Sequence, residues 1–231
     1  MNEVLIIIPA YNEEANIQRV VENIITNYPE FDYVVINDGS TDQTAEICRR
    51  NQYHLIDLPV NLGLAGAFQA GLKYAYQKGY PYAIQYDADG QHQANYIHAI
   101  HEEIQKGFDI VVGSRFVTEK KPLTLRMLGS NLISLAMYLT TGKKIKDPTS
   151  GMRMFNHKMI REFAVNLNYG PEPDTLSYLL KNGATVSEVQ VTMKERTAGE
   201  SYLKFASSIS YMVRMLTSIL LIQNFRKRKL T

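Results

Sequence analysis

Short apolar runs alternate with amphipathic segments along the first half of the chain. Val4 to Ile8 is an uninterrupted aliphatic run, as in a parallel strand that is buried on both faces. After a polar turn, residues 17–25 carry apolar side chains at positions i, i+3, i+4, i+7 and i+8, which is helical spacing. Further runs of strand length follow at 33–36, 54–58, 82–86 and 110–112. Strands separated by helix-length segments predict an α/β fold, with a mostly parallel sheet covered by helices.

Two polar positions in this half are predicted to start helices. Asn12 is the expected N-cap of the first helix. Ser40 and Gln43 have the spacing of a capping box, which is expected to open the second helix.

The second half of the chain is less regular. Residues 125–139 predict a helix with Leu128, Leu132, Leu135 and Leu139 on one side. The later predicted elements are a polar turn at 147–151, a helix at 174–181, a strand at 186–191 and a helix at 205–224. We expect residues 1–202 to form one domain, followed by a C-terminal segment of residues 203–231.

Composition narrows the class of protein only a little. The net charge of the 231 residues is +2, so bulk charge favours no particular partner, and we expect no nucleic acid. Cys48 is the single cysteine, which excludes a disulfide within the chain, fits a reducing cytosol, and is expected to be inert. The chain opens without a signal-peptide pattern, and no run reaches the roughly 20 apolar residues of a membrane span.

Four polar motifs each follow a predicted strand directly. They are Pro9-Ala-Tyr-Asn-Glu-Glu14, Asn37-Asp-Gly-Ser40, Asp87-Ala-Asp-Gly-Gln91 and Gly113-Ser-Arg115. In open α/β sheets, ligands bind outside the carboxyl ends of the strands. We therefore expect the four motifs to converge on one crevice.

Asp87 and Asp89 have the spacing of a site for a hard divalent cation. In an extended segment, side chains two residues apart point the same way, and two carboxylates aimed together repel unless a cation lies between them. Mg²⁺ prefers one or two carboxylates plus substrate phosphate oxygens, and Gln91 could add a neutral oxygen. The alternative is a solvated acidic turn, which the three companion motifs disfavour.

Asp38 could accept hydrogen bonds from a nucleotide base or ribose, although an acid is also favoured near a helix N-terminus for electrostatic reasons.

The spacing of Asn61, Gly63 and Gly66 differs from the dinucleotide-binding fingerprint, which argues against a nicotinamide enzyme. The chain also lacks the Gly-Lys-Ser/Thr sequence of a phosphate loop, which argues against a nucleoside-triphosphate motor.

Residues 7–14, 37–42 and 87–92 together resemble the motifs of the family 2 glycosyltransferases. A subgroup, the polyprenyl-phosphate glycosyltransferases typified by dolichol-phosphate mannose synthase, is matched further along the chain. Its additional matches are Gly113-Ser-Arg115, Arg126 with Ser130-Asn131, Asp147-Pro-Thr-Ser-Gly151 and Arg196-Thr-Ala-Gly-Glu-Ser201. The resemblance covers residues 4 to 202 and implies a GT-A (Rossmann-like) fold.

The resemblance also implies a nucleotide diphosphate sugar donor, with a UDP-sugar favoured, and Mg²⁺ or Mn²⁺ as cofactor. The residues it implies around the donor are Pro9, Tyr11, Asn12, Glu13, Ile36, Asp38 and Ala88. Those implied at the metal are Asp87, Asp89 and Gln91. Asn37 departs from the family pattern, because family members often carry an aspartate there.

The reaction that the resemblance implies is a single in-line displacement at the anomeric carbon, with inversion. Asp89 and Arg115 are expected to stabilise the leaving nucleoside diphosphate, Asp89 through the metal. The implied acceptor is a polyprenyl phosphate of the undecaprenyl or dolichyl type. Such a phosphate is largely dianionic at neutral pH, so it needs cations to hold it rather than a strong base.

Arg126, Arg196 and Ser201 are the candidates to hold the acceptor phosphate. Asp147 and Glu172 are the carboxylates expected to face the acceptor. Asp147 either orients an arginine or acts as a base, and its alternative is a cap on the turn before Pro148. Glu172 is alternatively an ordinary residue of a surface loop.

The C-terminal segment combines an apolar stripe with a basic cluster, Arg226 to Lys229. The stripe consists of Phe205, Ile209, Met212, Val213, Leu216, Ile219 and Leu220. This pattern predicts an amphipathic helix on an anionic membrane surface, or a helix packed on its own domain or on a second subunit of a homo-oligomer. The first alternative implies a cytoplasmic enzyme that is peripheral on the inner face of the membrane, where a small membrane protein is a candidate partner.

Three other functions stay open. The chain could transfer sugar to a polysaccharide or protein hydroxyl, for which Asp147 or Glu172 must act as a base. A sugar-1-phosphate nucleotidyltransferase would need a glycine-rich, lysine-containing loop near the N-terminus, which the chain lacks. A nucleotide-sugar sensor without turnover would need Asp38 but not the pair of Asp87 and Asp89.

Overall fold

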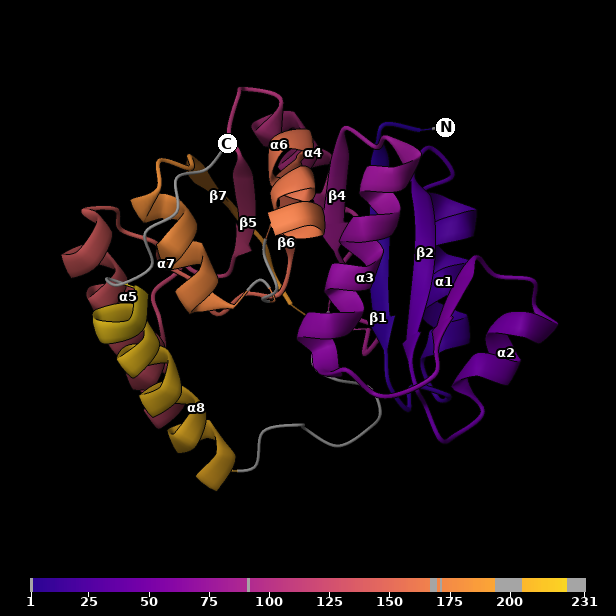
Figure 1. Cartoon of the computed structure of the whole chain (residues 1–231), viewed down its shortest axis with the longest axis horizontal. Helices are drawn as coiled ribbons and strands as arrows, with labels where there is room; N and C mark the ends of the chain where they lie inside the picture. Colours follow the sequence, from indigo (N-terminus) through magenta and orange to yellow (C-terminus); the bar gives the residue numbers. More distant parts are fainter. Residues whose placement is uncertain (1, 91, 167–169, 171, 194–204, 224–231) are drawn as a thin grey trace.

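A computed structural model describes residues 2–90, 92–166, 170, 172–193 and 205–223 (Figure 1). Its seven-stranded sheet has the order β3-β2-β1-β4-β6-β5-β7. The strands are β1 Val4–Ala10, β2 Asp32–Asp38, β3 Leu55–Leu58, β4 Tyr82–Gln85, β5 Ile110–Ser114, β6 Arg153–Asn156 and β7 Val186–Gln190. All neighbouring strands are parallel except that β6 runs antiparallel to both β4 and β5. The predicted mostly parallel α/β sheet is therefore confirmed.

Helices cover both faces of the sheet, because alternate residues of its buried strands face opposite sides. Leu5 and Ile7 of β1 face a core shared with α3, α5, α6 and α7. Val4, Ile6 and Ile8 face a second core, shared with α1, α2 and α4. The α-helices are α1 Ile17–Asn27, α2 Thr44–Arg50, α3 Gly63–Lys78, α4 Tyr96–Ile104, α5 Leu125–Thr141, α6 His157–Arg161, α7 Pro173–Lys181 and α8 Phe205–Thr217. Two π-helical turns complete the described helices, η1 Glu162–Asn166 and η2 Ser218–Ile222.

The antiparallel strand β6 determines where the segment 147–151 lies. Because β4 and β5 are both antiparallel to β6, the start of β6 lies at the edge where β4 and β5 end. The residues that precede Arg153 therefore join the carboxyl edge of the sheet. Our sequence prediction contained no strand at 153–156.

Both predicted helix starts are wrong. α1 begins at Ile17, and Asn12 lies in the preceding turn with a φ of 54°. α2 begins at Thr44, whose N–H donates to Oδ1 of Asp42 (3.0 Å). Asn12 and Ser40 instead form hydrogen bonds between the two turns, and those bonds belong to the site.

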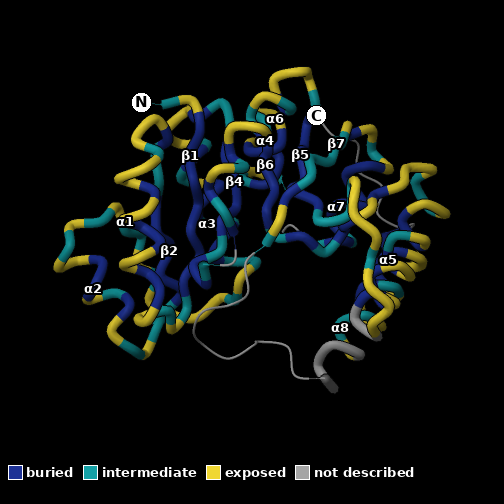
Figure 2. Tube along the Cα trace, turned by 180° about the vertical axis from the view of Figure 1, so that it is seen from behind, coloured by how far each residue is buried: buried dark blue, intermediate teal, exposed yellow. Residues whose placement is uncertain are grey.

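The C-terminal helix α8 and the turn η2 pack against α5 and α7, and α5 and α8 lie side by side in both views (Figures 1 and 2). Ile219 of the predicted stripe is buried, whereas Val213 and Leu220 are exposed. The side chains of Phe205 and Ile209, the basic cluster at 226–229 and the predicted boundary at residue 202 lie outside the described residues. In the described part, no helix is long and apolar enough to cross a bilayer.

Candidate functional site

Hydrogen bonds join the turns that follow β1 and β2. The N–H of Asn12 donates to Oγ of Ser40 (3.0 Å), and the N–H of Thr41 donates to Oδ1 of Asn12 (2.9 Å). The N–H of Glu13 donates to Oγ1 of Thr44 (2.8 Å). These bonds hold Asn12 and Glu13, two of the residues predicted to bind the nucleotide sugar, beside the end of β2.

Asp38, at the end of β2, is almost fully buried. Its Oδ1 accepts a 2.7 Å hydrogen bond from the N–H of Leu62, which draws the loop after β3 over the end of β2. Gly39 has a φ of 64°, and a Cβ there would lie 2.6 Å from the backbone nitrogen of Asn61. This close approach requires glycine, so the Asn37-Asp-Gly-Ser40 motif is built for contact between two loops.

Asp87 and Asp89 occupy the turn after β4. The Asp87 side chain is 32% exposed, whereas Asp89 is 7% exposed. Nε2 of Gln85 donates to Oδ1 of Asp87 (3.1 Å). The Asp87 carboxylate is thus held at one oxygen and still reaches solvent.

The buried ring of His92 contacts Asp87 through both of its nitrogens. The N–H of Asp87 donates to Nδ1 of His92 (2.9 Å), and Nε2 of His92 lies 3.5 Å from Oδ2 of Asp87. Because Nδ1 is an acceptor, the neutral ring carries its proton on Nε2, which faces the carboxylate. The hydroxyl of Tyr86 donates to the backbone oxygen of His92 (2.7 Å), which fixes the position of residue 92.

Gly151 brings the loop before β6 against this turn. A Cβ on Gly151 would lie 2.9 Å from Oδ2 of Asp87, so a larger residue there would displace the Asp87 carboxylate. The hydroxyl of Ser150 donates to the backbone oxygen of Gly113 (2.5 Å), which ties the same loop to β5. The loop therefore joins the Asp87 turn to the end of β5.

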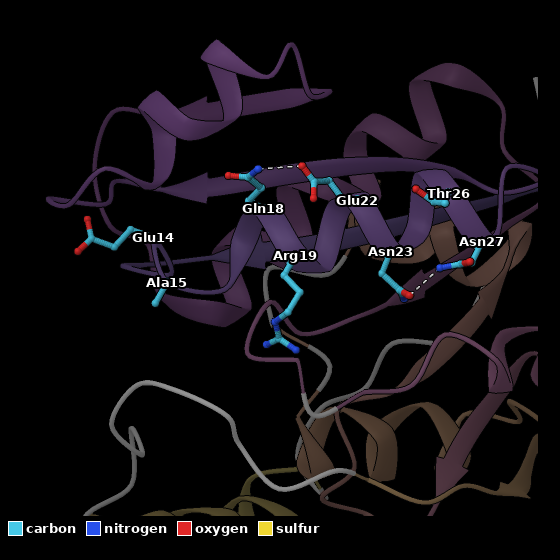
Figure 3. A pocket seen from close by; sticks show the side chains of 8 residues that line it. All are labelled: Glu14, Ala15, Gln18, Arg19, Glu22, Asn23, Thr26 and Asn27. Carbon is cyan, nitrogen blue, oxygen red and sulfur yellow. Dashed lines mark hydrogen bonds between the residues drawn. The ribbon is translucent and has the colours of Figure 1, made fainter.

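Arg19 extends from α1 toward the turn after β4 (Figure 3). A Cβ on Gly90, whose φ is 75°, would lie 2.6 Å from a terminal nitrogen of Arg19. The open hollow in Figure 3 is lined by eight residues between Glu14 and Asn27, on and just before α1. Neither Asp87 nor Asp38 lines it, so this hollow is separate from the place where the loops at the carboxyl ends of the strands meet.

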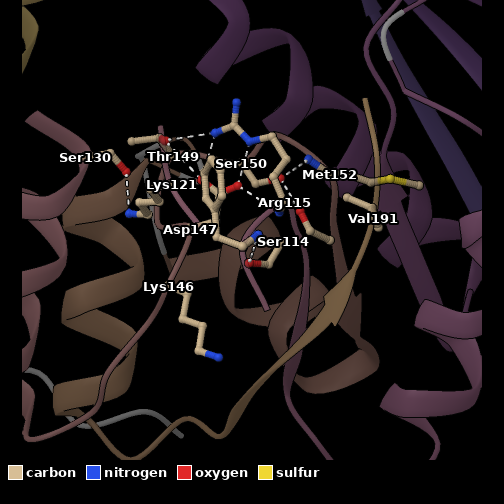
Figure 4. A network of polar contacts seen from close by, with 12 residues as sticks. Ser114, Arg115, Lys121, Ser130, Lys146, Asp147, Thr149, Ser150, Met152 and Val191 are labelled. Carbon is tan, nitrogen blue, oxygen red and sulfur yellow. Dashed lines mark hydrogen bonds and ion pairs between the residues drawn. The ribbon is translucent and has the colours of Figure 1, made fainter. Parts of the chain in front are cut away.

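Arg115 and Asp147 form a two-pronged ion pair (Figure 4). Nε of Arg115 donates to Oδ2 of Asp147 (2.7 Å), and its Nη2 donates to Oδ1 (2.8 Å). The N–H of Arg115 also donates to Oδ2 (3.1 Å). Such a fork fixes the plane of the guanidinium as well as its position, and the Arg115 side chain, 23% exposed, can still meet a ligand.

Asp147 is fully buried, and its pKa is lowered. Burial alone would raise it, but the hydrogen bonds and charge of Arg115, with the charge of Lys121, outweigh burial. The Glu188 carboxylate accepts the N–H of Asp147 (2.9 Å), which anchors the loop to β7. A carboxylate with a lowered pKa, whose two oxygens already accept hydrogen bonds from Arg115, is a poor proton acceptor. The geometry therefore fits the orienting role of Asp147 rather than the role of base.

Lys121 places a second cation next to this pair. Its Nζ donates to Oγ of Ser130 in α5 (3.1 Å). Burial lowers the pKa of Lys121, and the negative charge of Asp147 opposes that shift. The start of α5 therefore adjoins the Arg115–Asp147 pair.

Glu172 contacts the C-terminal helix instead of the ion pair. Its Oε2 accepts a 2.6 Å hydrogen bond from the hydroxyl of Tyr211 in α8. The hydroxyl of Ser218 donates to Oδ2 of Asp174 (2.6 Å) in the same way.

Arg153 is buried beneath the 147–151 loop and donates to the backbone oxygens of Ser150 (2.8 Å) and Pro148 (2.6 Å). Its burial lowers its pKa.

The remaining predicted residues fall into three groups. Pro9, Ile36 and Ala88 are buried at or near the ends of β1, β2 and β4, and the Ile36 side chain faces the core. Tyr11 is half-buried in the turn after β1. Gln91, Arg196, Ser201 and the side chain of Arg126 lie outside the described part of the structure.

Sequence reasoning missed the residues that support the loops. His92 and Gly151 were present only inside the quoted motifs, and Lys121 and Arg153 had no predicted role. Two of them could have been found from their place in the sequence: Gly151 ends the quoted Asp-Pro-Thr-Ser-Gly motif, and His92 directly follows Gln91. Their contacts depend on β6, which periodicity did not reveal.

Within the described residues, the other histidines and Cys48 form no second metal or thiol site. No group of three or more His, Cys, Asp or Glu side chains gathers there to hold a metal. Nε2 of His98 lies 2.8 Å from Oε1 of Glu30, whereas the ring of His101 packs edge-on against Tyr82 with its Nε2 3.5 Å from Oε2 of Glu3. Burial raises the pKa of the Cys48 thiol to about 11, which agrees with an inert cysteine.

Comparison with known proteins gives consistent likenesses. The sequence model of glycosyl transferase family 2 matches residues 5–164. An undecaprenyl-phosphate mannosyltransferase of Micrococcus luteus is 30% identical, over 86% of this chain and 86% of its own length. A UDP-N-acetylglucosamine–dolichyl-phosphate N-acetylglucosaminyltransferase of Methanococcus voltae is 31% identical, over 81% and 84%.

A solved structure has the same fold. Glucosyl-3-phosphoglycerate synthase from Mycobacterium tuberculosis, crystallised with Mn²⁺, UDP and phosphoglyceric acid, aligns with a TM-score of 0.70 at 18% identity. The alignment covers 98% of this chain and 80% of that one. This likeness confirms the predicted GT-A fold.

Proposed function

This chain belongs to glycosyl transferase family 2, and on that premise we propose that it transfers a sugar, with inversion, from a nucleotide diphosphate sugar to a polyprenyl phosphate. The observation that carries this proposal is the gathering of six segments at the carboxyl edge of the sheet. Contacts join the turns after β1, β2 and β3 to one another, and other contacts join the turn after β4 and Arg115 after β5 to the loop before β6. The acceptor class is supported by relatives named for undecaprenyl and dolichyl phosphates.

The residues of the β1–β2–β3 side fit the nucleoside. Asn12, Glu13 and Asp38 are held there by hydrogen bonds between loops, which preorganises them for a ligand. The relatives' names differ in the sugar, so they leave the sugar of this chain open.

The donor set after β4 fits a divalent metal that shares the substrate's phosphates. Asp87 and Asp89 supply two carboxylates, with Gln91 next to them in sequence, and the described residues contain no third acid in reach. Two carboxylates suit Mg²⁺ or Mn²⁺ that takes its other ligands from a diphosphate. When bound, such a metal neutralises charge on the leaving group. We therefore expect tight metal binding only in the presence of nucleotide.

Arg115, which the resemblance assigns to the leaving diphosphate, is held at the end of β5, where it is also suited to a phosphate of the acceptor. Asp147 holds its guanidinium in one plane, and Lys121 adds positive charge nearby. A phosphate dianion is already a nucleophile, so these residues need only orient it and offset its charge. That requirement agrees with the lowered pKa of Asp147, which disfavours a base.

The test of this function is transfer of labelled sugar. The protein is incubated with Mn²⁺, a panel of labelled nucleotide sugars and a polyprenyl phosphate dispersed in detergent, and the label is followed into organic solvent. We expect one donor to label the lipid and release a nucleoside diphosphate. Label that enters only polysaccharide or protein would favour the alternative acceptors, and donor binding without any release would favour a sensor.

His92 offers a prediction about metal affinity. His92→Ala removes the ring that accepts the N–H of Asp87 and faces its Oδ2, so the carboxylate loses its orientation. We expect the affinity for Mn²⁺ in the presence of UDP to fall about 10-fold or more, as for other groups that orient metal ligands. Calorimetric titration of Mn²⁺ into the protein–UDP mixture measures this without turnover.

The matched control is His54→Ala, which removes an exposed histidine far from the Asp87 turn in sequence. It should leave the Mn²⁺ affinity unchanged. Equal affinities in the His92→Ala and wild-type proteins would show that the ring does not position Asp87.

A further inference from the structure

Arg153, the first residue of β6, is a buried cation that the proposed chemistry does not yet use. Its side chain is 3% exposed, so it does not itself meet a bound donor or acceptor. Taking a guanidinium out of water is costly unless hydrogen bonds and opposite charges compensate it, and a well-packed apolar side chain would avoid that cost. An apolar side chain could not donate hydrogen bonds, and the hydrogen bonds of Arg153 indicate what it does.

Arg153 holds the loop 147–151 by two hydrogen bonds to its backbone. Nε of Arg153 donates to the backbone oxygen of Ser150 (2.8 Å), and Nη2 donates to that of Pro148 (2.6 Å). Both oxygens belong to one turn, in which the N–H of Ser150 donates to the backbone oxygen of Asp147 (3.2 Å). A planar guanidinium with donors at a fixed spacing suits two such oxygens, whereas the ammonium of lysine lacks that geometry.

The same loop contacts both sides of the site. Asp147, which directly precedes the two held carbonyls, forms the fork with Arg115 (Figure 4). Gly151, which directly follows them, lies so close to Asp87 that a Cβ on Gly151 would be 2.9 Å from Oδ2 of Asp87. A displaced loop would therefore move the guanidinium that is suited to a phosphate and disturb the carboxylate that is predicted to hold a metal.

Glu172 compensates the charge of Arg153 from the start of α7. Burial lowers the pKa of Arg153, and the negative charges of Glu172 and Asp147 are among those that oppose this shift. Tyr211, whose pKa is raised by burial and by Glu172, stays neutral and donates its hydroxyl to Glu172 (2.6 Å). The acid that was expected to face the acceptor thus acts on the cation beneath the loop.

We infer that Arg153 is a positioning residue of the transfer reaction: its guanidinium sets the place of the loop 147–151 and, through that loop, the places of Arg115 and Asp87. This role rests on the proposed function, because it takes Arg115 as a phosphate ligand and Asp87 as a metal ligand. The alternative is that Arg153 only stabilises the fold, as any buried group with satisfied hydrogen bonds does. The two roles differ in what they predict for variant protein that is still folded.

Arg153→Lys keeps the positive charge and loses the planar fork. We expect the transfer rate per folded molecule to fall on the order of 10-fold or more, because small displacements of orienting groups slow a reaction steeply. The affinity for Mn²⁺ in the presence of UDP should fall by about 10-fold, as for other losses of support around metal ligands. Initial rates are measured well below the unfolding temperature, and Mn²⁺ is titrated calorimetrically.

Two control variants separate positioning from stability. Phe155→Leu changes a side chain of the same strand that is 1% exposed. It should lower the free energy of unfolding and leave the rate per folded molecule unchanged. Arg161→Lys changes an exposed arginine of α6 and should alter neither quantity.

Arg153→Ala tests the guanidinium itself by chemical rescue. The substitution leaves a cavity beneath the loop, which methylguanidinium can enter at concentrations too low to unfold the protein. We expect methylguanidinium to raise the transfer rate of Arg153→Ala at least about fivefold, because it restores a planar pair of donors. Methylammonium, which carries the same charge without that geometry, should not raise the rate.

Two results would overturn the positioning role. One is an Arg153→Lys protein whose rate and Mn²⁺ affinity per folded molecule match those of Phe155→Leu, which would leave Arg153 a residue of stability alone. The other is a lower rate with unchanged amide hydrogen exchange in residues 113–117 and 147–152, because the loop would then not have moved.

Hydrogen exchange and the Mn²⁺ titration with UDP need no acceptor, so they separate this role from the proposed function. A wild type that transfers no sugar to polyprenyl phosphate would refute the proposed acceptor. Faster exchange in the two segments and weaker Mn²⁺ binding by Arg153→Lys would still support the positioning role in that case.

Discussion

Asp89→Ala is expected to lower the rate of sugar transfer on the order of 100-fold or more, at saturating donor and Mn²⁺. Asp89 is 7% exposed in the turn after β4, next to the Asp87 carboxylate that His92 and Gln85 hold. Removing one of two carboxylates leaves the leaving diphosphate without its electrostatic stabiliser, and the loss of one such stabiliser typically costs this much. The measurement is the initial rate of label transfer, with Mn²⁺ affinity in the presence of UDP measured in parallel.

Glu46→Ala is the control for Asp89→Ala, because it removes an exposed carboxylate on α2, outside the convergent loops. Its transfer rate and its Mn²⁺ affinity should match those of the wild type. Near-normal transfer by Asp89→Ala that a chelator still abolishes would show that the metal lies elsewhere.

Asp147→Asn is expected to lower both activity and stability. The variant keeps the side chain's size but loses the charge that holds Arg115 in a fork, and a misplaced orienting group costs about 100-fold in rate. The free energy of unfolding should fall by about 3 kcal/mol, at the low end for a buried pair, because Arg115 keeps some contact with water. Transfer rates and denaturant unfolding measure the two effects.

The acid side of the stability curve isolates the charge of Asp147. The pKa of Asp147 is lower in the folded chain than its ordinary value of 3.8, so its contribution is present above that value and is lost as the pH falls below it. The gap in unfolding free energy between wild type and Asp147→Asn should therefore be full at neutral pH and shrink below about pH 4. A gap that stays constant down to the lowest usable pH would mean that Asp147 acts through its shape alone.

Much of the donor side could be predicted from the sequence. Each motif there directly follows a strand with an unmistakable aliphatic run, and parallel strands bring their carboxyl ends to one edge. Asp38, Asp87 and Asp89 are therefore placed by chain order alone. The predicted helix caps were wrong where a polar residue had a partner distant in sequence. Asn12, for example, forms hydrogen bonds with Ser40 and Thr41 and does not cap a helix.

The acceptor side was harder to predict because its contacts are distant in sequence. Arg115 and Asp147 are 32 residues apart, and β6, which brings them together, is a short strand with no clear alternation. Periodicity also predicted that the α5 leucines share one side of the helix, but it could not show that this side faces solvent rather than the core. For the C-terminal stripe it left open a membrane surface or packing against protein, and Ile219 of that stripe is buried against the neighbouring helices.

The Arg115–Asp147 fork has a consequence for how such a chain can vary. It closes the 31 residues between its two partners into a loop whose ends are fixed by the fork and by the β5–β6 pairing. Lengthening a loop of that size costs little entropy, since each doubling adds only about 0.6 kcal/mol. The segment that carries α5 can therefore change its length and its exposed surface while the fork keeps the catalytic edge in place, provided that Lys121 and the core residues Ile133 and Met137 are kept. An enzyme built this way can acquire a different location or acceptor by replacing one excursion of the chain.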